Sequence, residues 1–297
     1  MSGTERSVAA LLAEAAVTLG QAGIGSPEVD AELLLASVQR RGRGEVRLAA
    51  ITGGTVDPIE AEAFDALVAK RARRHPLQHL TGLAPFRSFE LAVGPGVFVP
   101  RPETELVVQY AIDALRAVAS PTPRAVDLGT GSGAIALAMA LEVPHAEVTA
   151  VERSHLAYTW ARRNIVRLGA TNCRLVLGDL ASALPGEEGT MDVVISNPPY
   201  VPTGMVPRDP EVRLFDPAEA LYSGADGLDA VRALTVRAAA LLRPGGLLVI
   251  EHGELQGEAI RSILTERGFL AARTERDLTG RDRATLALRD VPSAGDH

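Results

Sequence analysis

The chain has few of the residues that build disulfide-bonded, metal-bound or membrane-spanning proteins. Cys173 is the one cysteine among 297 residues, which excludes an intramolecular disulfide and a metal site built on a cysteine pair. No apolar run reaches the roughly eighteen residues of a membrane-spanning helix. The first residues carry Glu5 and Arg6 and lack the apolar stretch of a signal peptide, so we expect a cytoplasmic location.

Basic charge is scarce as well. Lys and Arg number 30 against 37 Asp and Glu, a formal net charge of -7, so there is no overall basic field for gripping nucleic acid. Two local basic runs occur, at Arg40–Arg43 and Lys70–Arg74. We interpret both as solvated helix ends or loops, and contact with an acidic or RNA-bound partner is the alternative.

The pattern changes along the chain. Residues 1–75 show apolar residues at helical spacing and helix-start signals such as Asp57-Pro58, which predict a small helical bundle without strands. Prolines and glycines punctuate residues 76–100, which predicts a hairpin linker. A catalytic domain is expected over 101–290, and 291–297 is expected to form a flexible tail.

Residues 101–290 alternate between strand-like and helix-like segments. We expect strands at 125–128, 148–152, 173–178, 192–196, 247–251, 270–276 and 284–289. Helices are expected at 133–141, 155–168, 228–242 and 256–266. This alternation predicts an α/β fold, in which a mostly parallel, Rossmann-like sheet carries helices on both faces.

A glycine-rich loop follows the first of these strands and consists of Gly129, Thr130, Gly131, Ser132 and Gly133. Glycines let the backbone turn sharply and approach a ligand closely. Asp127 ends the strand, and its carboxylate suits an ammonium group but would repel a pyrophosphate. S-adenosylmethionine carries an ammonium and a sulfonium and no phosphate, so it fits this loop; a tight turn without any ligand is the alternative.

Acidic residues end the next two strands. Glu152 comes about twenty residues after the loop, where a carboxylate accepts hydrogen bonds from both ribose hydroxyls. Asp179 ends the third strand, with Leu180 beside it, and is expected to accept the adenine amino group. A surface acid is the alternative for each carboxylate. NAD is the rival ligand, because NAD sites also use a glycine loop and a ribose-binding acid.

The segment Asn197-Pro198-Pro199-Tyr200 follows an apolar strand, at the edge where ligands bind in open α/β sheets. Its two prolines remove two N–H donors, which leaves the Asn197 side-chain oxygen and the Pro198 carbonyl as acceptors. Two such acceptors hold both hydrogens of a planar NH2 group and turn its nitrogen toward a methyl donor, while Tyr200 stacks on the flat group. The segment predicts methyl transfer to an amide or a base amino group; a purely rigid turn is the alternative.

With these motifs the chain resembles the release-factor glutamine methyltransferase family (PrmC, or HemK). Further segments that carry the resemblance are Gln78–Gly82, Val99–Glu105, Asp127–Leu137 and Ile250–Gly253. The resemblance implies a helical amino-terminal domain that recognises the substrate protein, a hairpin linker and a class I methyltransferase domain. It also implies methyl transfer from S-adenosylmethionine to the glutamine of the Gly-Gly-Gln loop in class 1 peptide-chain release factors.

The resemblance assigns roles to residues. It implies that Gly129–Gly133, Glu152 and Asn197 bind the methyl donor, and that residues 197–200 also hold the glutamine. Many relatives carry an aromatic residue that can pack on adenine where this chain has Leu180. His79 and His252 are expected to be structural, and no metal is expected, since single histidines form no metal cluster.

Other functions remain open beside this one. A ribosomal-protein glutamine methyltransferase has a similar layout, and the segments Arg101–Glu105 and Glu251–Gly253 favour the release-factor branch only through the resemblance. An adenine-N6 DNA methyltransferase uses a similar Asn-Pro-Pro-Tyr segment, but no base-reading region is apparent here. A non-catalytic binding module is disfavoured by the intact glycine loop and Asn197. Residues 101–105 are expected either to start a helix or to close over the donor site.

Overall fold

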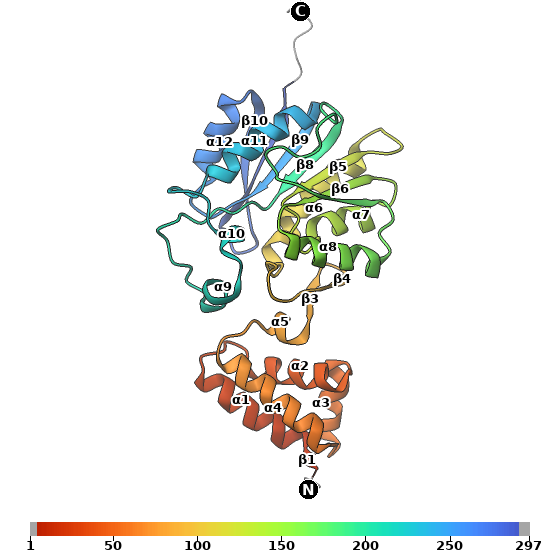
Figure 1. Ribbon diagram of the computed structural model, residues 1–297, viewed down its shortest axis with the longest axis vertical. Coiled ribbons are helices and arrows are strands. Elements are labelled where there is room, and N and C mark those ends of the chain that lie inside the picture. The colour runs from red at the N-terminus through yellow and green to blue at the C-terminus, as the bar shows by residue number, and fades with distance from the viewer. Residues whose placement is uncertain (1–4, 291–297) are drawn as a thin grey trace, which may run out of the picture. The chain divides into compact units, whose positions relative to one another are not determined.

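The computed structural model describes residues 5–290, and the predicted tail at 291–297 lies outside this range. The chain divides into two compact units. Residues up to 83 and the segment 208–215 form the first unit, whereas 84–207 and the residues from 216 onward form the second. In Figure 1 the first unit consists mainly of helices, and the second holds a central sheet with helices on both of its faces.

The first unit is a helical bundle. Its helices are α1 (Val8–Gln21), α2 (Pro27–Gln39), α3 (Arg43–Ile51), α4 (Pro58–Ala72), α5 (Leu77–Thr81) and α9 (Pro210–Phe215). Asp57 caps α4 as the Asp-Pro signal predicted, since its side chain accepts the N–H groups of Ile59 and Glu60. The expectation of a strand-free bundle is wrong in one detail: β1 (Arg6–Ser7) pairs with β2 (Thr55–Val56). Strands of two residues are too short to leave an alternating pattern.

Arg71 corrects the interpretation of its basic run as solvated. Its side chain is only 8% exposed, and Nε donates to Asp30 on α2 at 2.7 Å. Nη1 donates to Glu211 on α9, also at 2.7 Å. Arg71 therefore ties α4 to α2 and to a helix that comes much later in the chain. The other run, Arg40–Arg43, lies at the junction of α2 and α3 and is mostly exposed, as expected.

Replacing Arg71 is expected to destabilise the first unit. In Arg71→Met the buried Asp30 loses its cation, while Glu211 keeps only Arg74 at 3.4 Å, and an unpaired buried charge costs on the order of 3 kcal/mol. Unfolding in urea, followed by circular dichroism, measures the loss. Arg73→Met, at an exposed position of the same helix end, is the matched control and should unfold like the wild type. Equal stability of both variants would contradict a structural role for the Arg71 ion pairs.

The second unit is built on a seven-stranded sheet in the order β10-β11-β9-β8-β5-β6-β7. The strands are β5 (Arg124–Leu128), β6 (Glu147–Glu152), β7 (Cys173–Leu177), β8 (Met191–Ser196), β9 (Leu242–Glu251), β10 (Phe269–Arg276) and β11 (Asp282–Arg289). Strands β5 to β9 are parallel to their neighbours among themselves, and β11 is antiparallel to both β9 and β10. The predicted mostly parallel sheet is confirmed.

Helices cover both faces of this sheet (Figure 1). One apolar core lies under α6 (Pro102–Ala117), α7 (Ala134–Glu142) and α8 (His155–Leu168). A second core lies under α11 (Asp229–Leu241) and α12 (Gly257–Glu266). The remaining elements are the short helix α10 (Ala218–Leu221) and a hairpin of β3 (Leu83–Phe86) and β4 (Phe89–Ala92).

The start of α6 decides between the two interpretations of residues 101–105. Arg101 is the N-cap of α6, Pro102 occupies its first turn, and Glu103 and Glu105 follow there. Acidic residues in a first turn are stabilised by the helix dipole. The segment is therefore a helix start rather than a loop.

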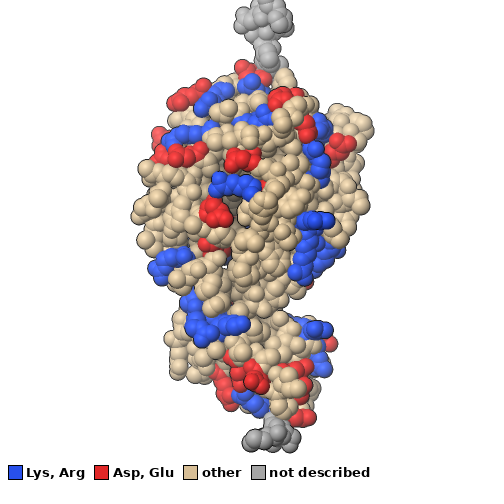
Figure 2. Space-filling model, in the orientation of Figure 1, with Lys and Arg blue, Asp and Glu red and all other residues tan. Residues whose placement is uncertain are grey.

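The carboxyl ends of the parallel strands meet at one edge of the sheet. β8 pairs with β5 through Ile195 and Asp127 and with β9 through Ser196 and Ile250. The glycine loop and Asn197 therefore leave the sheet at the same edge. No helix within residues 5–290 is long and apolar enough to cross a membrane. On the face shown in Figure 2, acidic and basic side chains lie interspersed over the second unit.

Candidate active site

The glycine loop joins β5 to α7. Gly129, Gly131 and Gly133 have φ angles of +82°, +58° and +89°, a region that strains other residues. At Gly129 and Gly131 an added Cβ would meet no atom within 4 Å, so open space lies beside the loop. At Gly133 it would lie 3.2 Å from Leu137, so this glycine also allows close packing. The loop is a cradle that a small ligand can approach.

Asp127 lies beneath this loop and is fully buried. Its Oδ2 accepts from Thr130 Oγ1 at 2.5 Å and from the Ala136 N–H at 3.2 Å, so the side chain braces the loop. Within the described residues Oδ1 has no hydrogen-bond partner. Burial raises the pKa of Asp127 to about 7, although the bonds from Thr130 and Ala136 lower it in part. One buried carboxylate oxygen is thus left for a donor.

Glu152 ends β6 and is 7% exposed. Its Oε2 accepts the Gly131 N–H at 2.8 Å, and its Oε1 accepts the Ser154 N–H at 2.8 Å. The carboxylate therefore ties the glycine loop to the turn after β6, a structural role that the sequence did not indicate. A carboxylate oxygen accepts two hydrogen bonds, so each oxygen keeps capacity for a ligand hydroxyl.

Asp179 and Leu180 follow β7. Asp179 is exposed, accepts the Ala181 N–H at 2.8 Å and lies 3.8 Å from Arg153 Nη1. Leu180 is partly buried against the core under α11 and α12. The Gly178 N–H donates to the Glu152 carbonyl at 2.9 Å, which holds the chain just before these residues against the end of β6.

Asn197 to Tyr200 follow β8, whose residues are all buried. Ser196 Oγ donates to the Leu128 carbonyl at 2.5 Å, which fastens the end of β8 to the start of the glycine loop. Pro198 is buried, and Asn197, Pro199 and Tyr200 are partly buried. No residue of 5–290 donates a hydrogen bond to the Pro198 carbonyl. The turn therefore has a free acceptor of the kind predicted.

Tyr200 is linked to α12 through its backbone, and its hydroxyl stays protonated. Its carbonyl accepts from Gln256 Nε2 at 2.9 Å, which links the turn to the start of α12. Burial and the nearby Glu251 carboxylate raise the pKa of its hydroxyl to about 12, against the opposing effects of Arg283 and Arg101. The phenol is therefore neutral at physiological pH.

The structure adds residues that were not predicted as site residues. Glu251, at the end of β9, is 2% exposed, and Thr104 of α6 is 4% exposed. Both lie at the same edge of the sheet as Asn197. The Thr104 and Asn197 side chains each lower the pKa of Glu251, so both are close to its carboxyl group. A signal was present in the sequence, since Glu251 ends an apolar strand just as Glu152 does.

His252 is buried and bonded, as expected of a structural histidine. Its two ring nitrogens lie 2.8 Å from Thr285 Oγ1 and 2.8 Å from the Gly253 carbonyl. Burial lowers its pKa, so the ring is neutral. Over residues 5–290, no group of three or more His, Cys, Asp or Glu side chains is arranged to hold a metal ion.

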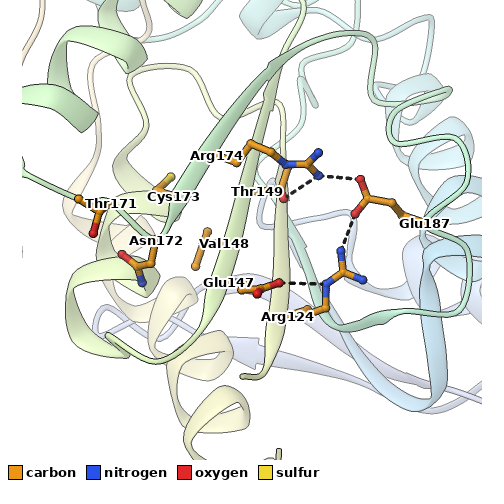
Figure 3. A pocket seen from close by; sticks show the side chains of 9 residues that line it. All are labelled: Arg124, Glu147, Val148, Thr149, Thr171, Asn172, Cys173, Arg174 and Glu187. Carbon is orange, nitrogen blue, oxygen red and sulfur yellow. Dashed lines mark hydrogen bonds and ion pairs between the residues drawn. The ribbon is translucent and has the colours of Figure 1, made fainter. Parts of the chain in front are cut away.

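A pocket of about 490 Å³ lies at the opposite edge of the sheet (Figure 3). It is lined by Arg124, Glu147, Val148, Thr149, Thr171, Asn172, Cys173, Arg174 and Glu187. These residues lie at or near the amino ends of β5, β6 and β7. Glu187 pairs with Arg124 and Arg174, each at 2.6 Å, so the charges there satisfy one another. Ligands of open parallel sheets bind at the carboxyl edge, so this pocket is not the candidate site.

Comparisons with known proteins agree with this geometry. A family model described as Methyltransferase small domain matches residues 104–224, and one described as PrmC N-terminal domain matches residues 10–82. A release factor glutamine methyltransferase of Streptomyces coelicolor is 48% identical over 284 residues, covering 95% of this chain and 98% of that one. The chain belongs to the release factor glutamine methyltransferase family.

Other members of the family are similarly close. The release factor glutamine methyltransferase of Bifidobacterium longum is 44% identical, covering 94% of this chain and 98% of that one. A solved release-factor-specific protein-(glutamine-N5) methyltransferase from Alicyclobacillus acidocaldarius is 30% identical, with a TM-score of 0.41, over 67% of this chain and 99% of that one. The expected Rossmann-like methyltransferase sheet with an amino-terminal helical region is confirmed, and the chain is a methyltransferase rather than a NAD-binding protein.

The buried carboxyls of this methyltransferase predict that stability depends on pH. The pKa values of Asp127 and Glu251 are both raised to about 7 by burial, so the folded protein binds their protons more tightly than the unfolded chain does. The free energy of unfolding should therefore decline as pH rises from about 4 to about 7, by up to about 1.4 kcal/mol per pH unit and group.

Urea titrations across this range measure the decline. Asp127→Asn cannot ionise, so its free energy of unfolding should decline less steeply than that of the wild type. Identical slopes would show that Asp127 titrates at its ordinary pKa.

Proposed function

We propose that this chain transfers a methyl group from S-adenosylmethionine to the side-chain amide nitrogen, N5, of the glutamine in the Gly-Gly-Gln motif of class 1 peptide-chain release factors. The main support for this proposal is that Asn197 and the free Pro198 carbonyl follow β8 at the same edge of the sheet where the glycine loop follows β5. Family membership favours a release factor over a ribosomal protein or a DNA adenine.

The residues around the glycine loop fit the methyl donor. The donor supplies an electrophilic methyl group on a sulfonium and also carries an ammonium group. We propose that the free Asp127 Oδ1 accepts the ammonium, and that the backbone of residues 129–133 lies against the donor. Glu152 has acceptor capacity left for the ribose hydroxyls. Asp179 would accept the adenine amino group, with Leu180 as an aliphatic contact in place of an aromatic ring.

We propose that Asn197 Oδ1 and the Pro198 carbonyl each accept one hydrogen of the glutamine NH2 group. Pro199 keeps the turn rigid, and Tyr200 packs on the planar amide. An amide lone pair is delocalised, so the turn's contribution is orientation, which supplies about 7–11 kcal/mol in favourable cases. The nitrogen lone pair would form the new N–CH3 bond as the S–CH3 bond breaks. The electron pair of the broken S–CH3 bond would stay on sulfur. The methylated nitrogen then loses one proton to solvent.

The other parts of the chain have proposed roles as well. We propose that the helical region 1–75 recognises the release factor, that 76–100 is a linker and that 101–290 carries the chemistry. The reaction needs no metal, because the leaving group is a neutral thioether. The proposed substrate is a protein, so the reaction requires neither direct reading of nucleic acid nor a membrane. We propose a cytoplasmic location, where release factors act.

Incubation with radiolabelled S-adenosylmethionine tests the proposed function. A bacterial class 1 release factor should be labelled, whereas a factor with its Gly-Gly-Gln glutamine replaced should not. Asn197→Ala should transfer at least about a hundredfold more slowly, as when one preorganised acceptor or donor is lost, with its melting temperature little changed. Label on ribosomal protein or duplex DNA instead, with none on the release factor, would contradict the proposal.

The proposed role of Asp127 predicts that donor binding depends on pH. The ammonium favours the ionised carboxylate, and the pKa of free Asp127 is raised to about 7. Affinity for S-adenosylmethionine should therefore weaken as pH falls below about 7, by at most about tenfold per pH unit. Calorimetric titration measures it. Asp127→Asn should bind weakly and lose this dependence; a wild-type affinity that is constant between about pH 5 and pH 7 would contradict the role.

A further inference from the structure

Glu251 lies directly beside Asn197. The parallel strands β8 and β9 pair Ser196 with Ile250. The residues that follow these two, Asn197 and Glu251, are therefore neighbours across a strand spacing of about 4.8 Å. On its other side Glu251 pairs with Ala284 of β11. Glu251 therefore occupies an interior position of the sheet and adjoins the first residue of the proposed amide-binding turn.

The surroundings of Glu251 do not stabilise its charge well. The residue is 2% exposed, and Oε2 has no hydrogen-bond partner of normal geometry within residues 5–290. Burial raises its pKa to about 7, although Thr104, Arg283 and Asn197 each lower it, and Glu103 raises it further. A buried, poorly compensated carboxyl group costs folding free energy, so its presence at this edge points to a task other than stability.

The side-chain amide of Asn197 has two possible orientations, and an ionised carboxylate beside it favours one of them. The oxygen and the NH2 group of an asparagine side chain have nearly the same shape, so the amide can turn over. Binding of a substrate NH2 group requires Oδ1 to face the substrate. A neighbour that both donates and accepts would tolerate either orientation, whereas an ionised carboxylate only accepts and so selects for Nδ2 on its own side.

We propose that Glu251 is a positioning residue, whose carboxylate accepts from Asn197 Nδ2 and thereby directs Asn197 Oδ1 toward the substrate amide. This inference rests on the proposed glutamine methylation and names a residue on which the amide-binding turn depends. The other charged or titratable groups that act on Glu251 are Glu103 on α6, Arg283 on β11 and Tyr200 after β8.

Protonation of Glu251 should abolish its preference for one orientation of the Asn197 amide. A protonated carboxyl group donates as well as accepts, so Asn197 Oδ1 can then turn toward Glu251 and away from the substrate. Methyl transfer should therefore slow as pH falls through the pKa of Glu251. Glu251→Gln has the same shape, is neutral at every pH and can likewise donate or accept.

Steady-state kinetics of Glu251→Gln over pH test the inference. We expect kcat to fall at least about twofold, because Asn197 then takes either orientation and only part of the enzyme presents Oδ1 to the substrate, with the KM for the release factor little changed. The acidic limb of the kcat profile should disappear. The melting temperature should equal or exceed that of the wild type above pH 7, since a buried charge is removed. The matched control is Glu254→Gln, an exposed carboxylate three residues later, which should keep the wild-type kcat and profile.

A paired substitution separates orientation from a general loss of charge. In Asn197→Asp with Glu251→Gln, the new amide donates to one oxygen of residue 197 and leaves the other facing the substrate. The double variant should be faster than either single variant, which is a favourable coupling in a double-mutant cycle.

The outcomes separate the two proposals. If the wild type does not methylate the release factor, the proposed function fails. If the wild type does so, the inference about Glu251 is overturned by either of two results: a Glu251→Gln enzyme with wild-type kcat and an intact acidic limb, or a double variant no faster than the faster of its two parents.

Discussion

Strand β8 is bonded to β5 on one side and to β9 on the other, and the arrangement of the candidate site depends on this pair of ladders. The Ser196 hydroxyl fastens the end of β8 to the Leu128 carbonyl, so the glycine loop and Asn197 start at the same level of the sheet. A register shift of one residue would turn every side chain of β8 to the opposite face. The glycine loop and residues 197–200 are therefore held together by backbone pairing rather than by contacts between their own side chains.

Carboxyl groups gather at this edge of the sheet, although burial there is unfavourable to them. Glu152 and Glu251 each end a strand, Asp127 is next to last in its strand, and all three are at most 7% exposed. Glu152 is compensated by two backbone N–H groups, whereas Asp127 and Glu251 each keep one oxygen without a partner within residues 5–290. We propose that the cationic donor compensates Asp127 and that Asn197 compensates Glu251. The cost in folding stability and the capacity for binding then have one physical origin, the desolvated carboxylate.

The fold could be predicted from the sequence where local pattern determines structure. The buried apolar strand β8 and the Asp57 cap follow from patterns within a few residues, and the structure has both. At residues 101–105 the pattern allowed a helix start or a closing loop, and the structure has the helix start. The partner of a buried group depends on which distant segments become neighbours. Arg71 was expected to be solvated because Glu211 lies far along the chain, on a helix that joins the first unit.

The site shows the same division. The residue types at the strand ends predict a methyl donor and a planar amide without reference to their spatial neighbours. The hydrogen bonds from Thr130 Oγ1 to Asp127 and from the Gly131 N–H to Glu152 were not predicted, because they depend on the local backbone path. In the sequence Glu251 stands out only as part of a family motif, since its place beside Asn197 follows from the order of β8 and β9 in the sheet.

A crystal structure with S-adenosylhomocysteine and a glutamine-containing release-factor peptide tests the central claim most directly. The account predicts that the glutamine NH2 group donates one hydrogen to Asn197 Oδ1 and the other to the Pro198 carbonyl, with its nitrogen facing the sulfur of the bound product. A glutamine amide bound by other groups, with Asn197 Nδ2 turned toward it, would contradict the account.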